Sequence, residues 1–426
     1  MQSGSVMVDN RGKGGKRGIR EAAGRLNQVL PALLACALPL STSAVSILAL
    51  AVFFLWLVEG NFRKKLRVIL ANPVAVAVLA YLCILALGVL WSPDIRAGLY
   101  VLQARWKIAL LAVFLTAINT HRRSLYISGF LVGLVVAMLM TYLAWFGILH
   151  YSDISEQHLT HNTFHVVYNP LLAFGIYLVL HEAIWRKTGM KMRFGLFGLA
   201  AGMIFNMFIT EGRAGQLVFF VLMGLLLIQI FSKTGWKAVA AACLLVPVMF
   251  FAGYGLSPVF KNRVDTARQE IVSFQENPNT SVGQRLQFWC NSWRIIRKHP
   301  LLGVGTGGFQ TSYARINHEN SPGCIATDNP HNQYVLVAAM VGIPGIVALL
   351  MIFITMFRQA WSSHDHWRRI RFAFPLFFLT IMLTESYLKV YETGFFFSLF
   401  GAVFYALPLD KRTGGSEKPG RVESVR

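Results

Sequence analysis

Two arginines at the expected ends of apolar segments have the chemistry needed to bind phosphate. Arg213 lies in the short sequence Glu-Gly-Arg-Ala-Gly, where small neighbours leave room for a bulky ligand, and Arg285 precedes two tryptophans. A guanidinium is permanently charged and can hold two phosphate oxygens at once. We therefore expect Arg213 and Arg285 to bind an anionic ligand. The structural alternative for Arg213 is an ion pair with Glu211 or a contact with lipid phosphate.

His331 is the candidate general base. It lies in the sequence Pro-His-Asn-Gln-Tyr, directly before an apolar segment. Pro330 restricts the approach of the chain, Asn332 can orient the ring, and neighbouring positive charges favour the uncharged imidazole. An uncharged imidazole can accept a proton from an attacking hydroxyl near neutral pH. The alternative is a structural histidine.

Further polar residues are expected to line a cavity around these three, and no metal or other cofactor is expected. A metal site at His158, His161 and His165 would need these residues to share one helical face, and no carboxylate is placed to complete it. The residues expected to line the cavity share a place near the ends of apolar segments: Arg96, Arg105, Lys107, Asn332, Tyr334, Glu385 and Lys389.

A glycine-rich loop precedes His331. Four glycines fall within residues 303–308, but the Lys-Ser/Thr pair of a nucleotide-binding loop does not follow them. Two interpretations remain for this loop: a tight turn with backbone amides facing an anion, or close packing.

Twelve apolar segments predict an all-α, polytopic membrane protein. Hydrophobic residues make up 55% of the chain and charged residues 14%, which excludes a soluble protein of 426 residues. Several segments are shorter than the roughly 20 residues that a spanning helix needs, and interfacial residues are expected to extend them. The apolar segments are residues 29–40, 44–58, 74–91, 108–118, 125–149, 166–180, 194–209, 217–231, 238–251, 334–357, 372–383 and 394–407.

These segments divide the chain into five parts. We expect a basic cytoplasmic leader (1–26), nine transmembrane helices (27–256), a long periplasmic loop (257–332), three more transmembrane helices (333–407) and a cytoplasmic tail (408–426). Lysine and arginine cluster in alternate connections, and basic residues beside a helix end are retained in the cytoplasm. A cleaved signal peptide is not expected, because the first apolar segment runs almost directly into the second.

The chain has a net charge of +21. In a soluble protein this would suggest nucleic acid as a partner. Here most of the charge is expected beside anionic lipid headgroups of the inner leaflet. The expected partners therefore include membrane lipids and no nucleic acid.

Residues 283–298 of the long loop predict a helix at the membrane interface. The tryptophans on its apolar face favour that position. Arg285 at its start would be unfavourable for the helix dipole unless an anion is bound. The apolar face repeats at helical spacing and consists of Leu286, Trp289, Trp293 and Ile296.

Two of the five cysteines, Cys290 and Cys324, lie in the long loop. In an oxidising compartment they could form a disulfide. Free thiols are the alternative, and no zinc-type spacing occurs among the cysteines.

Taken together, these features resemble the O-antigen ligase and polymerase superfamily of bacterial envelope glycosyltransferases. The resemblance is carried by His-Pro-Leu-Leu-Gly-Val-Gly-Thr-Gly (299–307), by Pro-His-Asn-Gln-Tyr (330–334) and by the positions of the two arginines. It implies a fold like that of GT-C membrane glycosyltransferases, in the inner membrane of a Gram-negative bacterium. It also implies metal-independent, inverting transfer of O-antigen from undecaprenyl diphosphate to the lipid A-core oligosaccharide, in lipopolysaccharide biosynthesis. His331 would be the base, and Arg213 and Arg285 would bind the diphosphate at the periplasmic face.

Three other functions stay open. Length and loop size resemble the ligase branch, but polymerases and protein O-oligosaccharyltransferases of the superfamily share the motifs. A secondary transporter would also have many spans. Transporters usually show internal repeats, or charges near mid-membrane. This chain shows no convincing repeat, and its candidate charged residues cluster at the outer membrane boundary instead of near mid-membrane.

Overall fold

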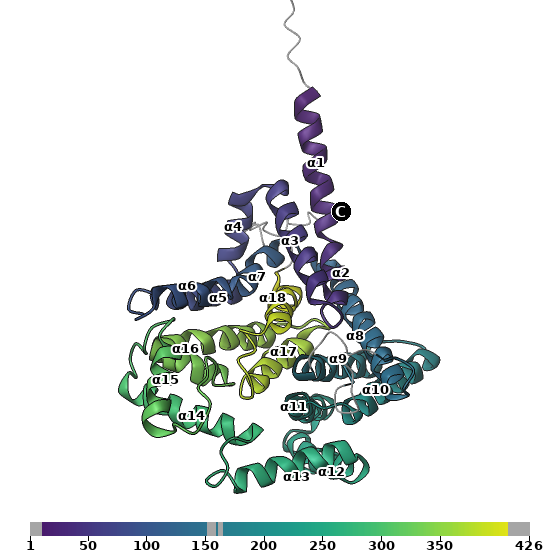
Figure 1. The fold of residues 1–426 in the computed structure, drawn as a ribbon. Coiled ribbons are helices and arrows are strands. Elements are labelled where there is room, and N and C mark those ends of the chain that lie inside the picture. The colour runs from purple at the N-terminus through teal and green to yellow at the C-terminus, as the bar shows by residue number, and fades with distance from the viewer. Residues whose placement is uncertain (1–10, 151–158, 161–164, 408–426) are drawn as a thin grey trace, which may run out of the picture.

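The computed structural model describes residues 11–150, 159–160 and 165–407, and it contains helices and no strands in this part of the chain (Figure 1). The short 3-10 helices η1 (Thr120–Arg122) and η2 (Ser232–Thr234) separate longer ones. The α-helices are α1 (Arg11–Asn27), α2 (Leu30–Ala37), α3 (Thr42–Glu59), α4 (Phe62–Leu70), α5 (Pro73–Leu87), α6 (Ile95–Gln103), α7 (Trp106–Ala117), α8 (Arg123–Trp145), α9 (His165–Trp185), α10 (Met190–Ile209), α11 (Arg213–Ile230), α12 (Trp236–Leu256), α13 (Pro258–Val272), α14 (Ser281–Lys298), α15 (Phe309–Asn320), α16 (Gln333–Trp361), α17 (Arg368–Ile381) and α18 (Tyr391–Tyr405).

The protein is a multi-pass membrane protein, but the predicted number of twelve spans is not confirmed. Eight helical segments among the described residues are long and apolar enough to cross a membrane, and α4 with α5, bent by 91°, would make a ninth. Each of the twelve apolar segments does form a helix. However, α2, α17 and α18 have only 8, 14 and 15 residues, fewer than a spanning helix requires.

Helix α18 is short because it lies inside the helix bundle. Every residue from Thr393 to Tyr405 is buried. Its phenylalanines pack against α9 and α17: the ring of Phe396 lies 5.5 Å from Phe174 of α9 and 5.8 Å from Phe374 of α17. Aromatic pairs at such distances favour tilted and edge-to-face geometry. An apolar segment in the sequence therefore marks a core helix here rather than a lipid-facing one.

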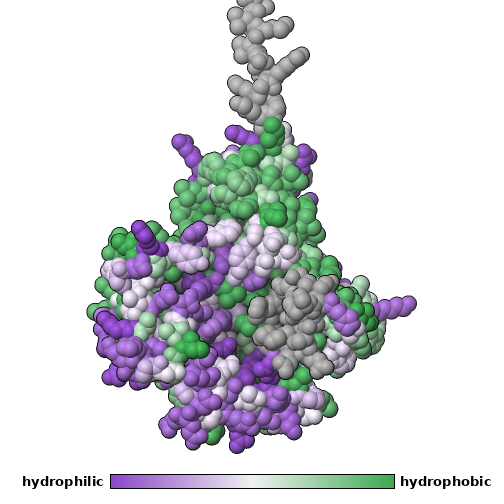
Figure 2. All heavy atoms as spheres, in the orientation of Figure 1, coloured by the Kyte–Doolittle hydropathy of each residue, from purple (hydrophilic) through white to green (hydrophobic). Residues whose placement is uncertain are grey.

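The helices of the long loop lie at one end of the molecule. Helix α1 projects at the opposite end, beside α3, and α12 and α13 lie farthest from it (Figure 1). Hydrophobic residues cover the surface around α2, α3 and α4, and hydrophilic residues gather over α13, α14 and α15 (Figure 2). Residues 257–332 thus form a helical polar cap on one end of the apolar bundle.

A break in α16 receives the glycine-rich loop. Gly342 has φ 62°, and a Cβ there would lie 2.3 Å from the carbonyl oxygen of Leu301. The amide of Val304 donates to Ala339 (2.9 Å), and the amide of Ile343 donates to Pro300 (3.1 Å). The loop therefore packs into the break.

The other glycines of this loop also allow close approach. Gly305 has φ 85° and lies against the backbone of Ser92, and the amide of Gly307 donates to the Ser92 hydroxyl at 3.1 Å. The amide of Thr306 donates to the carbonyl of Gly88 at 2.9 Å. Of the two interpretations of the loop, the structure supports close packing, because these amides are already used within the protein.

Helix α14 forms where it was predicted, but it buries a neighbouring face. Phe288, Asn291 and Ile295 are buried, whereas Trp293 is 59% exposed. The Asn291 amide bonds Tyr313 and Asn317 of α15 (both 3.2 Å), so polar contacts with α15 decide the orientation. Both loop cysteines are free thiols.

Candidate active site

Asn169 of α9 fixes the turn that carries Arg213. Its amide donates to the carbonyl of Glu211 at 2.7 Å, and its oxygen accepts from the Thr210 hydroxyl at 2.9 Å. A Cβ at Gly212 or at Gly215 would clash with Asn169. The small residues around Arg213 therefore serve the contact between α9 and α11.

Arg213 is the first residue of α11 and does not pair with Glu211. Its Nη1 lies 3.6 Å from the Glu270 carboxylate, and Glu211 instead pairs with Arg263 of α13. Glu270 also accepts a hydrogen bond from the amide of Val282 in the first turn of α14 (3.0 Å). One carboxylate thus links Arg213 to α14, the helix that carries Arg285.

Arg213, Arg263 and Arg285 line one cavity of about 90 Å3. The structure therefore brings the two predicted arginines together and adds a third. Glu211 also lines this cavity, on its polar wall. Arg285 lies in the second turn of α14, because the helix begins at Ser281. The helix dipole acts mainly on the first turn, so the dipole argument for an anion at Arg285 loses most of its force.

Arg285 makes no ion pair with any described residue. Its charge acts on Tyr387, which lines the same cavity. Burial and Glu385 raise the pKa of the Tyr387 hydroxyl, and Arg285 opposes this rise. Arg285 therefore offers an unpaired positive charge beside the segment that joins α17 to α18.

An apolar groove of about 760 Å3 adjoins the arginine cavity. It lies between α11, α12 and α13, and its walls include Phe220, Phe250 and Phe260. Arg213 and Arg263 line both the groove and the cavity. A molecule with an anionic head and a long apolar tail would find both surfaces in one place.

His331 contacts Glu385 through its Nδ1 atom. The imidazole stacks on Phe288 of α14, with ring centroids 5.9 Å apart, and His331 adopts a left-handed backbone with φ 51°. Left-handed conformations of residues other than glycine are uncommon and concentrate at functional sites. With the carboxylate on Nδ1, the tautomer that carries its proton on Nδ1 leaves Nε2 as the proton acceptor.

Asn329 holds both members of this pair. Its amide donates to Glu385 Oε1 at 2.7 Å, and its oxygen accepts from the His331 amide at 3.1 Å and from the Ser386 hydroxyl at 2.8 Å. The expected role of Asn332 in orienting the ring is not observed. Asn332 caps α16 by accepting from the amides of Tyr334 and Val335.

The Glu385 carboxylate lies outside the membrane-spanning segments and is mostly buried. Burial raises its pKa, but hydrogen bonds from His331, the Ser386 amide and Asn329 outweigh burial and hold the pKa below its ordinary value. The carboxylate is therefore ionised at neutral pH. In this position it can orient the His331 imidazole and stabilise its charged form.

A second cavity, of about 120 Å3, contains two of the other predicted residues, Arg105 and Lys389. Arg96 is exposed on α6, and Lys107 is buried with its Nζ donating to the Lys389 carbonyl at 2.8 Å. Tyr334 donates to the carbonyl of Leu379 at 2.8 Å. Arg105 and Lys389 thus line a cavity other than the one lined by Arg213 and Arg285.

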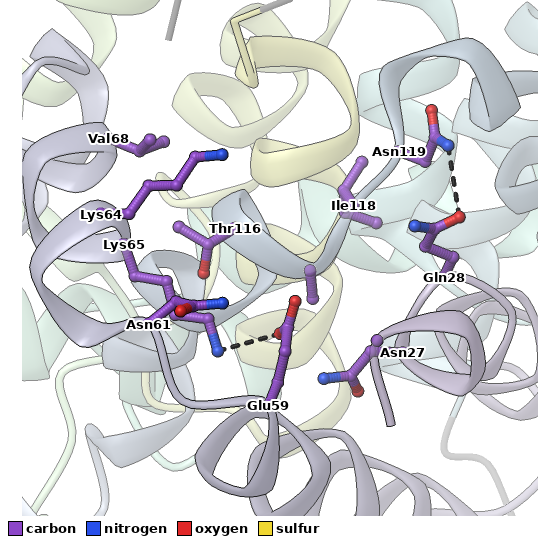
Figure 3. A pocket seen from close by; sticks show the side chains of 12 residues that line it. Asn27, Gln28, Glu59, Asn61, Lys64, Lys65, Val68, Thr116, Ile118 and Asn119 are labelled. Atoms are coloured by element: carbon purple, nitrogen blue, oxygen red, sulfur yellow. Dashed lines mark hydrogen bonds and ion pairs between the residues drawn. The ribbon is translucent and has the colours of Figure 1, made fainter. Parts of the chain in front are cut away.

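A polar pocket at the other end of α7 contains an ion pair between Lys65 and Glu59. Figure 3 shows Lys65 and Glu59 facing each other, 2.9 Å apart, with Gln28 bonded to Asn119. Lys65 also donates to the carbonyl of Trp56 at 2.6 Å. The pocket is separated from Arg105 by the length of α7, about 17 Å at 1.5 Å per residue. These contacts indicate a stabilising role for the pocket.

One group of metal-ligand type occurs among the described residues, at His181, Glu182 and His366. His181 lies about 22 Å along α9 from Val166, whose carbonyl bonds Tyr387. The group therefore belongs to the end of the bundle remote from His331. Of the histidines considered for a metal site, His158 and His161 lie outside the described residues.

Sequence reasoning did not identify Arg263, Glu270 and Asn329 as site residues. Asn329 directly precedes the Pro-His-Asn sequence, and its closeness to His331 in the chain was the signal that could have identified it. Arg263 and Glu270 lie on the amphipathic helix α13. Their pairing with residues of other helices depends on tertiary packing.

Comparison with known proteins finds similarity in the part of the chain that carries these residues. Residues 198–350 match the family model for O-antigen ligase, a range that includes the three arginines and His331. A protein of Haemophilus influenzae (strain ATCC 51907 / DSM 11121 / KW20 / Rd), described as uncharacterized, is 26% identical over 191 residues. That alignment covers 43% of this chain and 47% of the relative, so the chain matches about half of the relative's length. Residues 198–350 are thus similar to the O-antigen ligase family.

Proposed function

We propose that the protein is an O-antigen ligase. It would transfer O-antigen from undecaprenyl diphosphate to the lipid A-core oligosaccharide at the periplasmic face of the inner membrane. The superfamily match supports glycosyl transfer in general. The finer assignment rests on the shape and charge of the site.

The observation that carries the proposal is the junction of a cationic cavity with an apolar groove. Arg213 and Arg263 line both. A polyprenyl diphosphate combines a doubly charged head with a long hydrocarbon tail, so its two parts match the cavity and the groove. Arg285, which has no ion pair among the described residues, would complete the diphosphate site.

The reaction breaks one bond and forms one. The acceptor hydroxyl oxygen attacks the anomeric carbon of the glycan, and the bond from that carbon to the diphosphate oxygen breaks. The electron pair leaves with the polyprenyl diphosphate, whose growing charge the arginines stabilise. His331 Nε2 takes the hydroxyl proton, while Glu385 stabilises the imidazolium. Attack from the face opposite the diphosphate inverts the anomeric centre.

The donor is already activated by its leaving group. The proposed step therefore assigns no chemistry to a nucleotide, a metal or another cofactor. It needs a base for one proton and cations for the departing diphosphate, and the site contains both.

Two activities of the same superfamily are the alternatives. A polymerase would join repeat units on the lipid carrier, and a protein O-oligosaccharyltransferase would use serine or threonine as the acceptor. A transporter would bind a similar lipid without joining anything. The polymerase, the oligosaccharyltransferase and the transporter can each be distinguished from a ligase by the products that they leave.

The test is a deletion strain combined with a reconstituted reaction. A ligase deletion should leave lipid A-core without O-antigen while lipid-linked polymer accumulates. The purified protein should join glycan to lipid A-core in detergent, where no gradient exists. Core that bears a single repeat in the deletion strain would favour a polymerase, and transport without joined product would reject transfer altogether.

A further inference from the structure

The second cavity contains a buried cation without a partner. Arg105 lies between α6 and α7 and is 2% exposed. Its Nε and Nη1 atoms have no hydrogen-bond partner among the described residues, and no described carboxylate pairs with it. A buried charge that is left unpaired costs several kcal/mol. The site is therefore incomplete without an anion.

The cavity has room for such an anion. It measures about 120 Å3, and Arg105 shares its wall with Tyr100, Gln310 and Lys389. Asp328 also lines the cavity, but this carboxylate pairs with Lys389 at 2.7 Å. The Lys389 and Asp328 charges cancel, so Arg105 supplies the excess positive charge.

The Arg105 cavity and the cavity lined by Arg213, Arg263 and Arg285 are separate, and both border the segment between α17 and α18. They share no lining residue. Lys389 lines the Arg105 cavity, whereas Thr384 and Tyr387 line the arginine cavity. Glu385, which contacts the base, lies between these positions in the chain. A donor in one cavity and an acceptor in the other would both be close to His331.

We infer that Arg105 binds a phosphate group of the acceptor glycolipid. This inference rests on the proposed function. An anionic oxygen group accepts two parallel hydrogen bonds from a guanidinium, which would satisfy the two unpaired N–H groups. Arg105 is then a determinant of acceptor specificity and takes no part in bond breaking.

The experiment compares two acceptors with the purified full-length chain in nanodiscs. One is lipid A-core with its phosphates, and the other is the same material after phosphatase treatment. The wild type should show the lower acceptor KM with the phosphorylated form. Arg105→Gln should raise that KM roughly 10- to 100-fold, the worth of a hydrogen bond between charged groups, and should abolish the preference. Donor KM should stay unchanged, and Arg105→Lys should recover part of the loss.

Arg315→Gln is the matched control, because Arg315 is exposed on α15, the helix that supplies Gln310 to the cavity. It should behave as the wild type. A second arm varies the fraction of phosphatidylglycerol in the nanodisc. If Arg105→Gln changed only the response to this lipid, the anion would come from the membrane and the acceptor assignment would be rejected.

The failures of the inference and of the proposed function are distinguishable. Unchanged acceptor KM and preference in Arg105→Gln would reject the inference while transfer continued. If the wild type joined glycan to neither acceptor, the proposed function would fail, and acceptor binding measured without donor would still test Arg105. If Arg105→Gln did not fold, equal affinity of the wild type for both acceptors would reject the inference.

Discussion

Glu385 reaches the Nδ1 atom of His331 from a position 54 residues further along the chain. The contact joins the segment before α16 to the segment after α17, two parts of the sequence with no shared motif. Asn329 binds both partners, so the geometry of the pair is set before any substrate arrives. A site with this preorganisation needs little rearrangement to accept a proton.

Replacement of His331 by alanine should abolish turnover but spare donor binding. General-base catalysis contributes about 10²- to 10⁴-fold, and the arginine cavity is lined by other residues. Transfer rate and donor affinity should be measured separately in purified protein. Turnover close to wild type would move the base elsewhere.

Metal removal gives a second check on the same mechanism. Because His331 and Glu385 form the proposed acid–base pair, treatment with EDTA should leave the transfer rate unchanged. The group at His181, Glu182 and His366 offers an internal comparison, since it is the one place among the described residues where metal ligands gather. EDTA sensitivity that disappeared in His181→Ala would show that a metal at this remote group supports activity.

Glu385→Gln should lower kcat while leaving donor KM nearly unchanged. Glutamine keeps the size of the side chain but removes the negative charge that stabilises the imidazolium. Because the pKa of Glu385 is held below its ordinary value, its ionised form stabilises the fold at neutral pH. That contribution is lost only as pH falls through the depressed pKa. Wild-type kcat in Glu385→Gln at neutral pH would show that the carboxylate is not used in catalysis.

Candidate residues for the chemical step could be chosen from the sequence, but the residues that position them could not. His331, Arg213 and Arg285 could be chosen as candidates because a base and permanent cations beside apolar segments suit anion binding and proton transfer, and the structure places the two arginines in one cavity. Glu385 could be expected as a polar residue near the site, but its contact with His331 is long-range. No spacing rule links positions so distant in the chain. Asn332, adjacent in sequence, was expected to orient the ring and instead caps α16.

The number of spans shows a second limit. Apolar composition predicts burial, but it does not distinguish lipid from protein as the surroundings. Helix α18 is buried by neighbouring helices from Thr393 to its end, and α3 is largely exposed on the surface. In the sequence, α3 and α18 both appear simply as apolar segments. Their difference comes from packing between α18, α7 and α9, which a single apolar run does not record.

Arg213→Lys and Arg285→Lys should each lower transfer roughly 10-fold or more. A lysine keeps the charge but loses the paired geometry on phosphate, and a hydrogen bond between charged groups is worth about 1.5–3 kcal/mol. The matched control is Arg297→Lys, because Arg297 is exposed near the end of α14. Near wild-type rates in both lysine variants would assign the two arginines to structure.

Gly342→Ala should destabilise the protein by about 1–3 kcal/mol. The added Cβ would lie 2.3 Å from the Leu301 carbonyl oxygen, at a φ of 62° that favours glycine. Thermal unfolding followed by intrinsic fluorescence should show a lower midpoint. Gly198→Ala is the control, since nothing lies within 4 Å of a Cβ at this helical position. An equal midpoint for Gly342→Ala and the wild type would contradict the packing of the glycine loop into α16.

A cysteine at Asn279 should be labelled by a membrane-impermeant thiol reagent in intact cells, and one at Ser362 only after permeabilisation. The two positions are exposed and lie on either side of α16, whose 29 residues are long and apolar enough to cross a membrane. The charge pattern predicts that Asn279 faces the periplasm, because basic residues are retained inside. Both variants must be made in a chain whose own cysteines are replaced, since Cys290 is exposed. Labelling of Ser362→Cys in intact cells would reverse the orientation, and labelling of both would show that α16 does not cross the membrane.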